Sequence, residues 1–214
     1  MSRTAIMTSP LEDALRNALL NADIPTSNSA LHQQLSSRAY EAHLVDVAYN
    51  IIETPIGRLL LARTSRGLVR VAFDNENLDS VLESLAAQLS PRVMQVPRKL
   101  DDIADQFSEY FAGNRTKFSV TLDFSLSTGF RQQVQQQLPT IAYGHTQSYK
   151  EVAASVGNPK AIRAVGTACA TNPLPIVVPC HRVVRSDGSL GGYLGGLDTK
   201  RTLLELEHTK ATAQ

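Results

Sequence analysis

The hydrophobic pattern of the chain changes twice, and these changes divide its 214 residues into three parts. From Asp46 to Ser125, short β-prone runs are followed by apolar residues at helical spacing, which is typical of a small α/β unit. From residue 126 the spacing is mostly helical. We therefore expect an α+β protein with an α/β scaffold domain over residues 46–125, a mostly helical domain over residues 126–209 and a tail over residues 210–214.

Residues 1–45 are expected to form a helical extension. Apolar residues recur at helical spacing directly after Pro10, and a second helix is expected over Ala30–Leu44, beyond the break at Pro25. The scaffold domain is expected to contain strands at Val47–Glu53, Arg58–Arg63, Leu68–Phe73 and Lys117–Phe124, and helices at Leu78–Leu89 and Leu100–Phe111. The second domain is expected to contain helices at Gly129–Leu138, Tyr149–Val156, Lys160–Ala170 and Leu197–His208.

The composition excludes several classes of protein. Hydrophobic residues make up 43% of the chain, which is too high for a disordered protein. No apolar run reaches the roughly 20 residues that cross a bilayer, and the first ten residues lack the apolar segment of a secretory signal. The two cysteines, Cys169 and Cys180, form no Cys-x-x-Cys pair, so we expect neither a disulfide framework nor a bound metal. These features favour a cytoplasmic protein with free thiols and no membrane partner.

Charge and helix spacing in the second half favour an anionic partner. Residues 126–214 hold nine Lys and Arg against five Asp and Glu, whereas residues 1–125 carry a net charge of −3. Gly157-Asn158-Pro159 separates two short helices, and Lys160 and Arg163 begin the second, as in a helix-turn-helix. Both patterns also occur in proteins that never bind nucleic acid, so chance asymmetry and an ordinary helix pair are the alternatives.

The most informative segment is Asn172–Val184, in which three prolines and an apolar run surround Cys180. A cysteine attacks carbon as the thiolate, and its ordinary pKa of about 8.5 leaves little thiolate at neutral pH. The neighbouring His181 can take the proton, directly or through one water. Because successive side chains of an extended segment point to opposite faces, a water-bridged relay is expected. The alternative is that Cys180 is a small buried hydrophobic residue.

Two further features belong to the same region. A carboxylate would fix the tautomer of His181 and stabilise its charged form. The last predicted helix offers three carboxylates between which spacing alone does not choose: Asp198, Glu205 and Glu207. The segment Gly188–Gly196 has five glycines around Tyr193, which suits the wall of a flat pocket for an aromatic ring. A flexible surface loop is the alternative.

Taken together, these segments resemble a known family. The stretches Ser148-Tyr149, Arg163–Gly166, Asn172-Pro173, Pro179–Val183, Gly192-Tyr193 and Leu203–Glu207 follow the order found in the O6-alkylguanine-DNA alkyltransferases, also called methylated-DNA–protein-cysteine methyltransferases. The match runs from Phe130 to Glu207, and residues 46–124 resemble the family's amino-terminal domain. The resemblance implies a winged helix-turn-helix-like DNA-binding domain whose second helix lies in the minor groove of double-stranded DNA.

The resemblance also implies a single-turnover DNA repair reaction without a cofactor. Cys180 would take the alkyl group, such as methyl, from O6 of a damaged guanine, and also from O4 of alkylthymine. His181 would act as the base through a water, Glu207 would orient His181, and Asn172 would arrange the site. Tyr149 would donate to the departing guanine, and Arg163 would fill the gap left by the extruded nucleotide.

The other implied residues form a pocket and a DNA-contacting surface. The lesion pocket would comprise Gly192, Tyr193, Leu194 and Gly195. Phosphate contacts would come from Lys160, Arg182 and Arg185, which would give salt-dependent affinity without sequence preference. We expect a monomer.

The sequence departs from many relatives at Gln135, where they carry Trp, and this is interpreted as a packing change. Leu194 stands where some relatives have a small or polar residue, which bears on the size of alkyl group accepted. Cys169 is interpreted as a core thiol. Two other functions are weighed: a non-catalytic module that recognises alkylated guanine, which the presence of Cys180 disfavours, and a cysteine hydrolase, for which no convincing oxyanion site is found.

Overall fold

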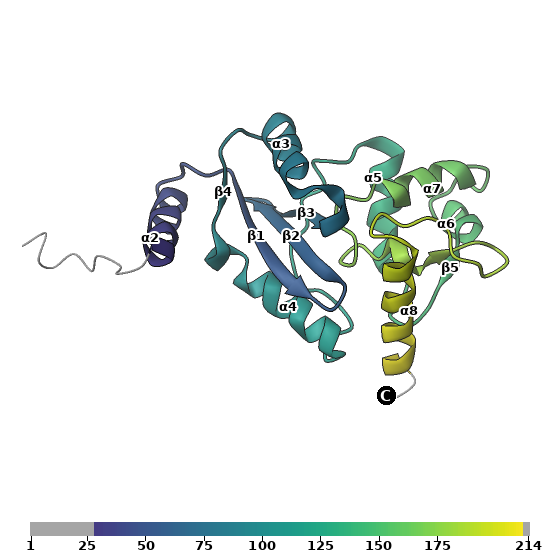
Figure 1. The fold of residues 1–214 in the computed structure, drawn as a ribbon. Helices are drawn as coiled ribbons and strands as arrows, with labels where there is room; N and C mark the ends of the chain where they lie inside the picture. Colours follow the sequence, from purple (N-terminus) through teal and green to yellow (C-terminus); the bar gives the residue numbers. More distant parts are fainter. Residues whose placement is uncertain (1–27, 212–214) are drawn as a thin grey trace, which may run out of the picture.

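The computed structural model describes residues 28–211, which form two domains lying side by side (Figure 1). A sheet with helices on its faces forms the first domain, and helices dominate from residue 129 onward. The α+β class expected from the sequence is therefore confirmed. Helix α2 (Asn28–Glu41) lies at the outer edge of the first domain, and the helix predicted directly after Pro10 falls outside the described residues. No helix within residues 28–211 is long and apolar enough to span a membrane.

The first domain is built on a four-stranded sheet with the strand order β3-β2-β1-β4. Strands β1 (Val47–Thr54), β2 (Gly57–Thr64) and β3 (Gly67–Phe73) are antiparallel neighbours joined by tight turns. Gly57 and Gly67, which begin β2 and β3, have φ angles of 100° and 141°, which glycine adopts without a steric penalty.

Helices cover both faces of this sheet, which explains why β2 is apolar without alternation. Leu59 and Leu61 pack in one cluster with α4 (Asp101–Ala112), whereas Leu60 and Ala62 pack in a second cluster with α3 (Leu78–Gln88). Two 3-10 turns precede these helices: η1 (Asp74–Glu76) and η2 (Pro97–Lys99). The cluster on the α4 side continues into the second domain as far as Cys180, so the two domains share a core.

The second domain contains four helices, two 3-10 turns and a two-stranded parallel sheet. These elements are α5 (Gly129–Gln137), η3 (Leu138–Thr140), β5 (Gln147–Ser148), α6 (Tyr149–Ser155), α7 (Ile162–Ala170), η4 (Cys180–Arg182), β6 (Val183–Val184) and α8 (Leu197–Ala211). Helix α6 begins with a capping box between Ser148 and Glu151, which satisfies its first backbone donors. Helices α6 and α7 contact each other across the turn at Gly157 and form the predicted helix–turn–helix pair.

Two sequence predictions are corrected, and one strand was not predicted. Lys117–Phe124 is not a strand, because only one bridge, between Leu68 and Leu122, joins it to the sheet. The three-residue strand β4 (Val93–Gln95) was not predicted, since a run this short carries no readable alternation. Lys160 lies in the turn before α7 rather than in its first helical turn.

Candidate active site

Cys180, His181 and Arg182 form the 3-10 turn η4 in the interior of the second domain. Their exposed fractions are only 2%, 0% and 7%. The sequence predicted an extended segment here, and the structure corrects this to a turn. Successive side chains of a 3-10 turn point about one third of a turn apart, so Cys180 and His181 still face different directions.

Asn172 fixes the position of the cysteine sulfur. Its side-chain Nδ2 donates to Cys180 Sγ at 3.2 Å and to the carbonyl of Val178 at 2.8 Å, while its Oδ1 accepts from the backbone N–H of Leu174 at 3.0 Å. Asn172 is itself buried, with 1% of its surface exposed. One amide side chain therefore ties the loop before η4 to the thiol, and its role in the reaction stays a prediction.

The Cys180 thiol is protonated in the resting protein. Burial raises its pKa to about 11, and the hydrogen bond from Asn172 and the charge of Lys200 only partly oppose this effect. The reactive species is the thiolate, so the site needs a base that removes the proton while substrate is bound.

His181 has the geometry and protonation state of a proton acceptor. Its Nε2 lies 2.9 Å from Glu207 Oε1, and an ionised carboxylate can only accept a hydrogen bond, so Nε2 carries the proton. Burial lowers the pKa of His181, although Glu207 opposes this effect, and the imidazole is therefore neutral. Its Nδ1 is buried and accepts no hydrogen bond from any residue between 28 and 211, which leaves a lone pair for a proton.

Of the three candidate carboxylates, Glu207 is the one that contacts His181. Glu207 is fully buried, whereas Glu205 is exposed and the Asp198 side chain is 98% exposed and paired with Arg201. Burial alone would raise the pKa of Glu207, but its hydrogen bonds and charge interactions with His181 and Arg182 lower the pKa to about 2. The carboxylate beside His181 is thus ionised throughout the physiological range.

Arg182 does not have the position expected of a DNA contact. Its Nε and Nη2 bind the two carboxylate oxygens of Glu207 at 2.9 Å each, and its Nη1 donates to the carbonyl of Ile141 at 2.6 Å. A guanidinium that is buried and paired in this way cannot also reach the DNA backbone. The prediction that Arg182 binds phosphate is therefore corrected, because its charge compensates the buried Glu207.

The glycine-rich loop passes between aromatic rings from both domains. A Cβ on Gly191 would overlap the hydroxyl of Tyr149, and one on Gly195 would lie 2.9 Å from the ring of Phe73 in the first domain. The Tyr193 ring meets Phe73 edge-on at 5.6 Å and His181 at 6.4 Å between ring centroids. Asn75, also from the first domain, donates to the carbonyl of Leu194 at 3.1 Å. The loop thus brings the predicted pocket residues next to the η4 turn.

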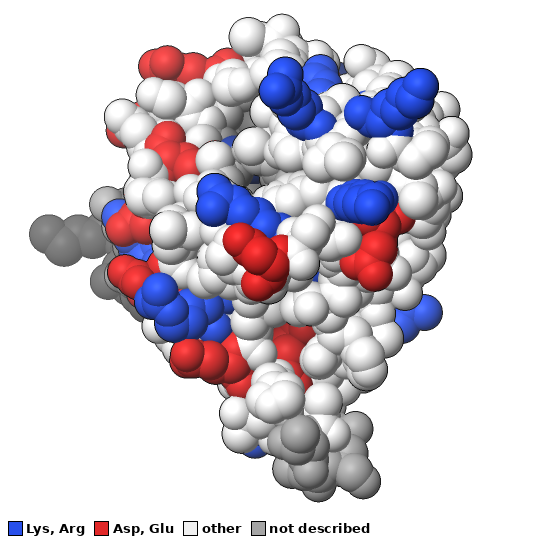
Figure 2. Space-filling model, turned by 90° about the vertical axis from the view of Figure 1, so that its right-hand side faces the viewer, with Lys and Arg blue, Asp and Glu red and all other residues white. Residues whose placement is uncertain are grey.

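Basic side chains expected to contact DNA lie on the surface around the helix pair. Arg163 is the second residue of α7, Lys160 precedes that helix and Arg185 follows β6, and all three are exposed. Figure 2 views the end of the molecule that the second domain forms, and several separate Lys and Arg side chains gather on its upper part. This surface is suited to a polyanion.

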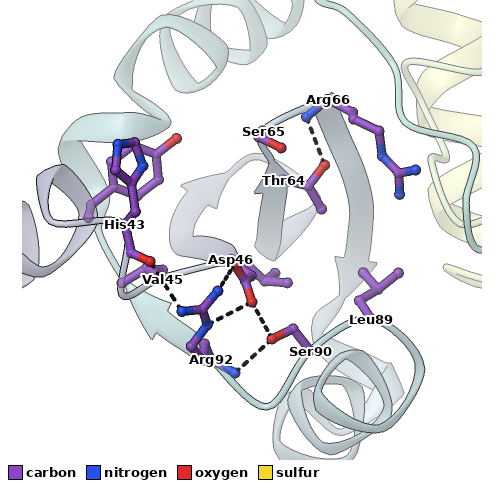
Figure 3. Close-up of a pocket in the computed structure, with 11 residues that line it drawn as sticks. His43, Val45, Asp46, Thr64, Ser65, Arg66, Leu89, Ser90 and Arg92 are labelled. Carbon is purple, nitrogen blue, oxygen red and sulfur yellow. Dashed lines mark hydrogen bonds and ion pairs between the residues drawn. The ribbon is translucent and has the colours of Figure 1, made fainter.

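A cavity in the first domain lies away from these residues. It has a volume of about 490 Å³ and is bordered by α2, the start of β1 and the β2–β3 turn. Its charged groups are already paired, since Arg92 binds Asp46 and Asp46 accepts from Ser90 (Figure 3). None of the predicted site residues lines it, and we assign it no ligand. Within residues 28–211, no three His, Cys, Asp or Glu side chains cluster as a metal site requires.

Comparisons with known proteins identify the family. The model described as "6-O-methylguanine DNA methyltransferase, DNA binding domain" matches residues 129–209, and the model of that family's "ribonuclease-like domain" matches residues 47–124. The chain belongs to the O6-methylguanine-DNA methyltransferase family. The two matches cover most of the chain and correspond to the two domains of the fold.

Relatives with known functions are similar over most of the chain. The methylated-DNA–protein-cysteine methyltransferase of Mycobacterium tuberculosis is 42% identical over 167 residues, which cover 78% of this chain and 96% of the relative. The bifunctional transcriptional activator and DNA repair enzyme Ada of Escherichia coli is 35% identical over 204 residues, covering 91% of this chain and 57% of Ada. The crystal structure of Mycobacterium tuberculosis OGT in complex with DNA has a TM-score of 0.67 and 41% identity, covering 76% of this chain and 94% of that one.

Two residues that contact or influence the site, Lys200 and Tyr110, were not predicted from the sequence. Lys200 is fully buried, donates from Nζ to the carbonyl of Val183 at 2.6 Å and lowers the pKa of Cys180. Its spacing from Leu203 and Glu207, at three and seven residues, marks one helix face and could have revealed it. Tyr110 donates to Glu207 Oε1 at 2.7 Å, and no local signal points to a partner 97 positions away.

Acid is expected to destabilise the protein in two stages. His181 has a lowered pKa in the folded state, so stability is complete above its unfolded pKa near 6.5 and falls below it. Glu207 also has a lowered pKa, so its contribution is present above pH 4.5 and is lost toward pH 2. At about 1.4 kcal/mol per unit, this second contribution is on the order of 3 kcal/mol. Urea unfolding at a series of pH values measures both.

A matched pair of variants identifies the second stage. Glu207→Gln should flatten the loss of stability between pH 4.5 and 2, whereas Glu205→Gln, which changes an exposed carboxylate on the same helix, should keep it. Equal slopes for the two variants would show that Glu207 does not carry the effect.

Proposed function

We propose that the protein repairs double-stranded DNA by transferring the alkyl group of O6-alkylguanine to its own Cys180, once per molecule. The observation that carries this proposal is the arrangement around the sulfur. Asn172 holds Sγ at 3.2 Å, and the next residue, His181, is buried, neutral and bound to an ionised Glu207. A nucleophile, a base and the group that orients the base thus occupy one buried site.

The proposed reaction includes two proton transfers, one from Cys180 to His181 and one from Tyr149 to the departing guanine. The Cys180 proton passes through a water to His181 Nδ1, the sulfur–carbon bond forms, and the bond between the alkyl carbon and O6 breaks. The electron pair of the broken bond stays on guanine, and a proton from the Tyr149 hydroxyl neutralises the resulting negative charge. Burial raises the pKa of Tyr149, which keeps the hydroxyl protonated until the guanine leaves. The product is a thioether, and no cofactor takes part.

The substrate base must leave the stack to reach this buried sulfur. Extrusion of a nucleotide costs a few kcal/mol, and an Arg side chain that occupies the vacated space offsets part of that cost. Arg163 is proposed for this role because it is exposed at the start of α7. Lys160 and Arg185 are proposed to contact phosphates, and Arg182 is withdrawn from that set.

The proposed lesion pocket consists of Gly192, Tyr193, Leu194 and Gly195. The Tyr193 ring stands beside both His181 and Phe73, so a flat base that enters next to it comes close to the η4 turn. The proposal includes O4-alkylthymine as a second, smaller substrate. It also includes action as a monomer, because each part of the reaction is assigned to one chain. The cytoplasmic location is proposed from the free thiols of Cys169 and Cys180.

Mass spectrometry tests the proposal. After incubation with duplex DNA containing O6-methylguanine, the intact protein should gain one methyl group and no more, and tryptic mapping should place that group on Cys180. A non-catalytic binding module or a cysteine hydrolase would keep its original mass. Methylation at Cys169, or none, would overturn the proposal.

Arg163→Ala is expected to slow repair of duplex DNA on the order of 10-fold or more, because base extrusion loses its stabilising side chain. Reaction with free O6-benzylguanine needs no extrusion and should keep its rate. Single-turnover rates with both substrates measure the difference.

Arg98→Ala is the matched control, since Arg98 is an exposed arginine in the first domain. It should leave both rates unchanged. Equal slowing of the two reactions by Arg163→Ala would remove Arg163 from the extrusion step.

A further inference from the structure

Tyr110 connects the first domain to the reactive site through one hydrogen bond. It belongs to α4, on the face of the sheet that shares its core with the second domain. Its side chain is 1% exposed and packs against Phe111, Phe118 and Tyr143, with ring centroids 5.3 to 6.1 Å away. Its hydroxyl donates to Glu207 Oε1 at 2.7 Å. A residue in the amino-terminal domain therefore contacts the carboxylate that orients the proposed base.

The contacted oxygen is the one that also binds His181. Glu207 Oε1 accepts from Tyr110, from His181 Nε2 at 2.9 Å and from Arg182 Nη2 at 2.9 Å. Oε2 accepts from Arg182 Nε at 2.9 Å and from the backbone N–H of Gly144 at 3.2 Å. Among the donors in the described residues, Tyr110 alone comes from the first domain. It holds the carboxylate from the first domain and shares Oε1 with the imidazole of His181.

We propose that Tyr110 is a positioning residue by which the amino-terminal domain orients Glu207 and limits how strongly this carboxylate stabilises protonated His181 during alkyl transfer. The inference rests on the proposed function, in which neutral His181 accepts the Cys180 proton. When several donors share one acceptor oxygen, each donor draws on the negative charge of that oxygen. Each of the other hydrogen bonds to the oxygen is therefore weaker. Tyr110 therefore keeps more of His181 neutral and ready to accept a proton.

The hydroxyl is able to donate throughout the working range. Burial and then the charge of Glu207 raise the pKa of Tyr110 well above its ordinary value. The other titratable groups that face the His181–Glu207 pair belong to η4, α8, the glycine-rich loop and the segment before β5: Cys180, Arg182, Lys200, Tyr193 and Tyr143. The residues that carry these groups all stay in place in Tyr110→Phe, which removes only the hydroxyl that donates to Glu207 Oε1.

Tyr110→Phe tests the proposal, with free O6-benzylguanine as the substrate so that DNA binding plays no part. We expect the acidic limb of the pH–rate profile to move up by about 0.5 to 1 unit, because Glu207 then stabilises protonated His181 more strongly. We also expect transfer at neutral pH to slow by about two- to threefold, because a shift of this size lowers the neutral fraction of His181 by roughly that factor near pH 7. The deficit should shrink as the pH rises.

Tyr143→Phe is the matched control. The Tyr143 hydroxyl is also buried, lies in the neighbouring ring and makes no hydrogen bond within residues 28–211. Removal of this hydroxyl changes the same atom type in the same cluster without touching the Glu207 oxygens. Its pH–rate profile should coincide with that of the unaltered protein. Rates are compared well below the melting temperature of each variant.

A second readout does not depend on transfer. In Cys180→Ser protein, NMR titration of His181 should give a higher pKa when Tyr110 is also changed to Phe. An unchanged histidine titration, or a rate loss that is the same at every pH, would overturn the inference and leave Tyr110 as packing alone. If instead the unaltered protein gains no alkyl group on Cys180, the proposed function fails, whatever the histidine titration shows.

Discussion

Cys180→Ala is expected to abolish alkyl transfer while DNA binding persists. The variant removes a single buried sulfur, and no other atom of the site can form the thioether. Cys180 has only 2% of its surface exposed, so the surface that meets DNA is unchanged. Intact-mass measurement with methylated DNA should show no gain, and a binding assay with the same duplex should show unaltered affinity.

The second cysteine supplies the control. Cys169 is buried in α7, and burial strongly raises its pKa, so it is expected to be inert. Cys169→Ala should therefore accept one methyl group as the unaltered protein does. Loss of transfer in Cys169→Ala, or residual transfer in Cys180→Ala, would contradict the assignment of the acceptor. Simultaneous loss of binding in Cys180→Ala would point to misfolding instead.

Arg182→Met is expected to be the most destabilising of the changes considered. It leaves Glu207 buried with no compensating guanidinium, and removal of one partner from a buried ion pair costs about 3–5 kcal/mol. For a chain of this size, each kcal/mol lowers the melting temperature by about 2–4 °C, so a decrease of roughly 6–20 °C is expected in thermal unfolding.

Two comparisons separate this explanation from a role in DNA contact. Arg185→Met changes an exposed arginine and should alter stability by about 0.5 kcal/mol or less, but it should weaken the salt dependence of DNA binding. DNA binding by the folded fraction of Arg182→Met should have the same salt dependence as DNA binding by the unaltered protein. The double variant Arg182→Met/Glu207→Leu should regain much of the lost stability, because it removes both charges together. A weakened salt dependence in Arg182→Met would restore Arg182 as a phosphate contact.

Local patterns predicted the regular elements well where burial and hydrogen bonding follow the same period. In the segment Lys117–Phe124, burial follows the period of a strand but hydrogen bonding does not. Phe118, Val120 and Leu122 are partly buried in alternation, as the sequence suggested. The edge strand β3 nevertheless offers this segment a single bridge at Leu68. Alternation reports which side chains face the core, but a strand also needs a neighbour along its length.

The reactive site was predicted as a set of residue types but not as a network. The adjacent Cys180 and His181 indicated nucleophile chemistry before any contact was known, and Asn172 was expected from the family resemblance. The resemblance named Glu207, but spacing alone left Glu205 as an alternative until the packing of α8 was known. The pairing of Arg182 with Glu207 spans 25 positions. Contacts between such distant residues are set by the packing of whole elements, which no short window of sequence contains.

The glycine-rich loop limits how the protein could be engineered to accept other substrates. Side chains at Gly191 or Gly195 would collide with Tyr149 or Phe73, whereas a Cβ at Gly192 would meet nothing within 4 Å. Libraries intended to accept bulkier leaving groups or synthetic labels should therefore vary Gly192 and keep Gly191 and Gly195 constant. Among the glycines of this loop, Gly192 is thus the position at which an added side chain finds open space without a positive φ angle.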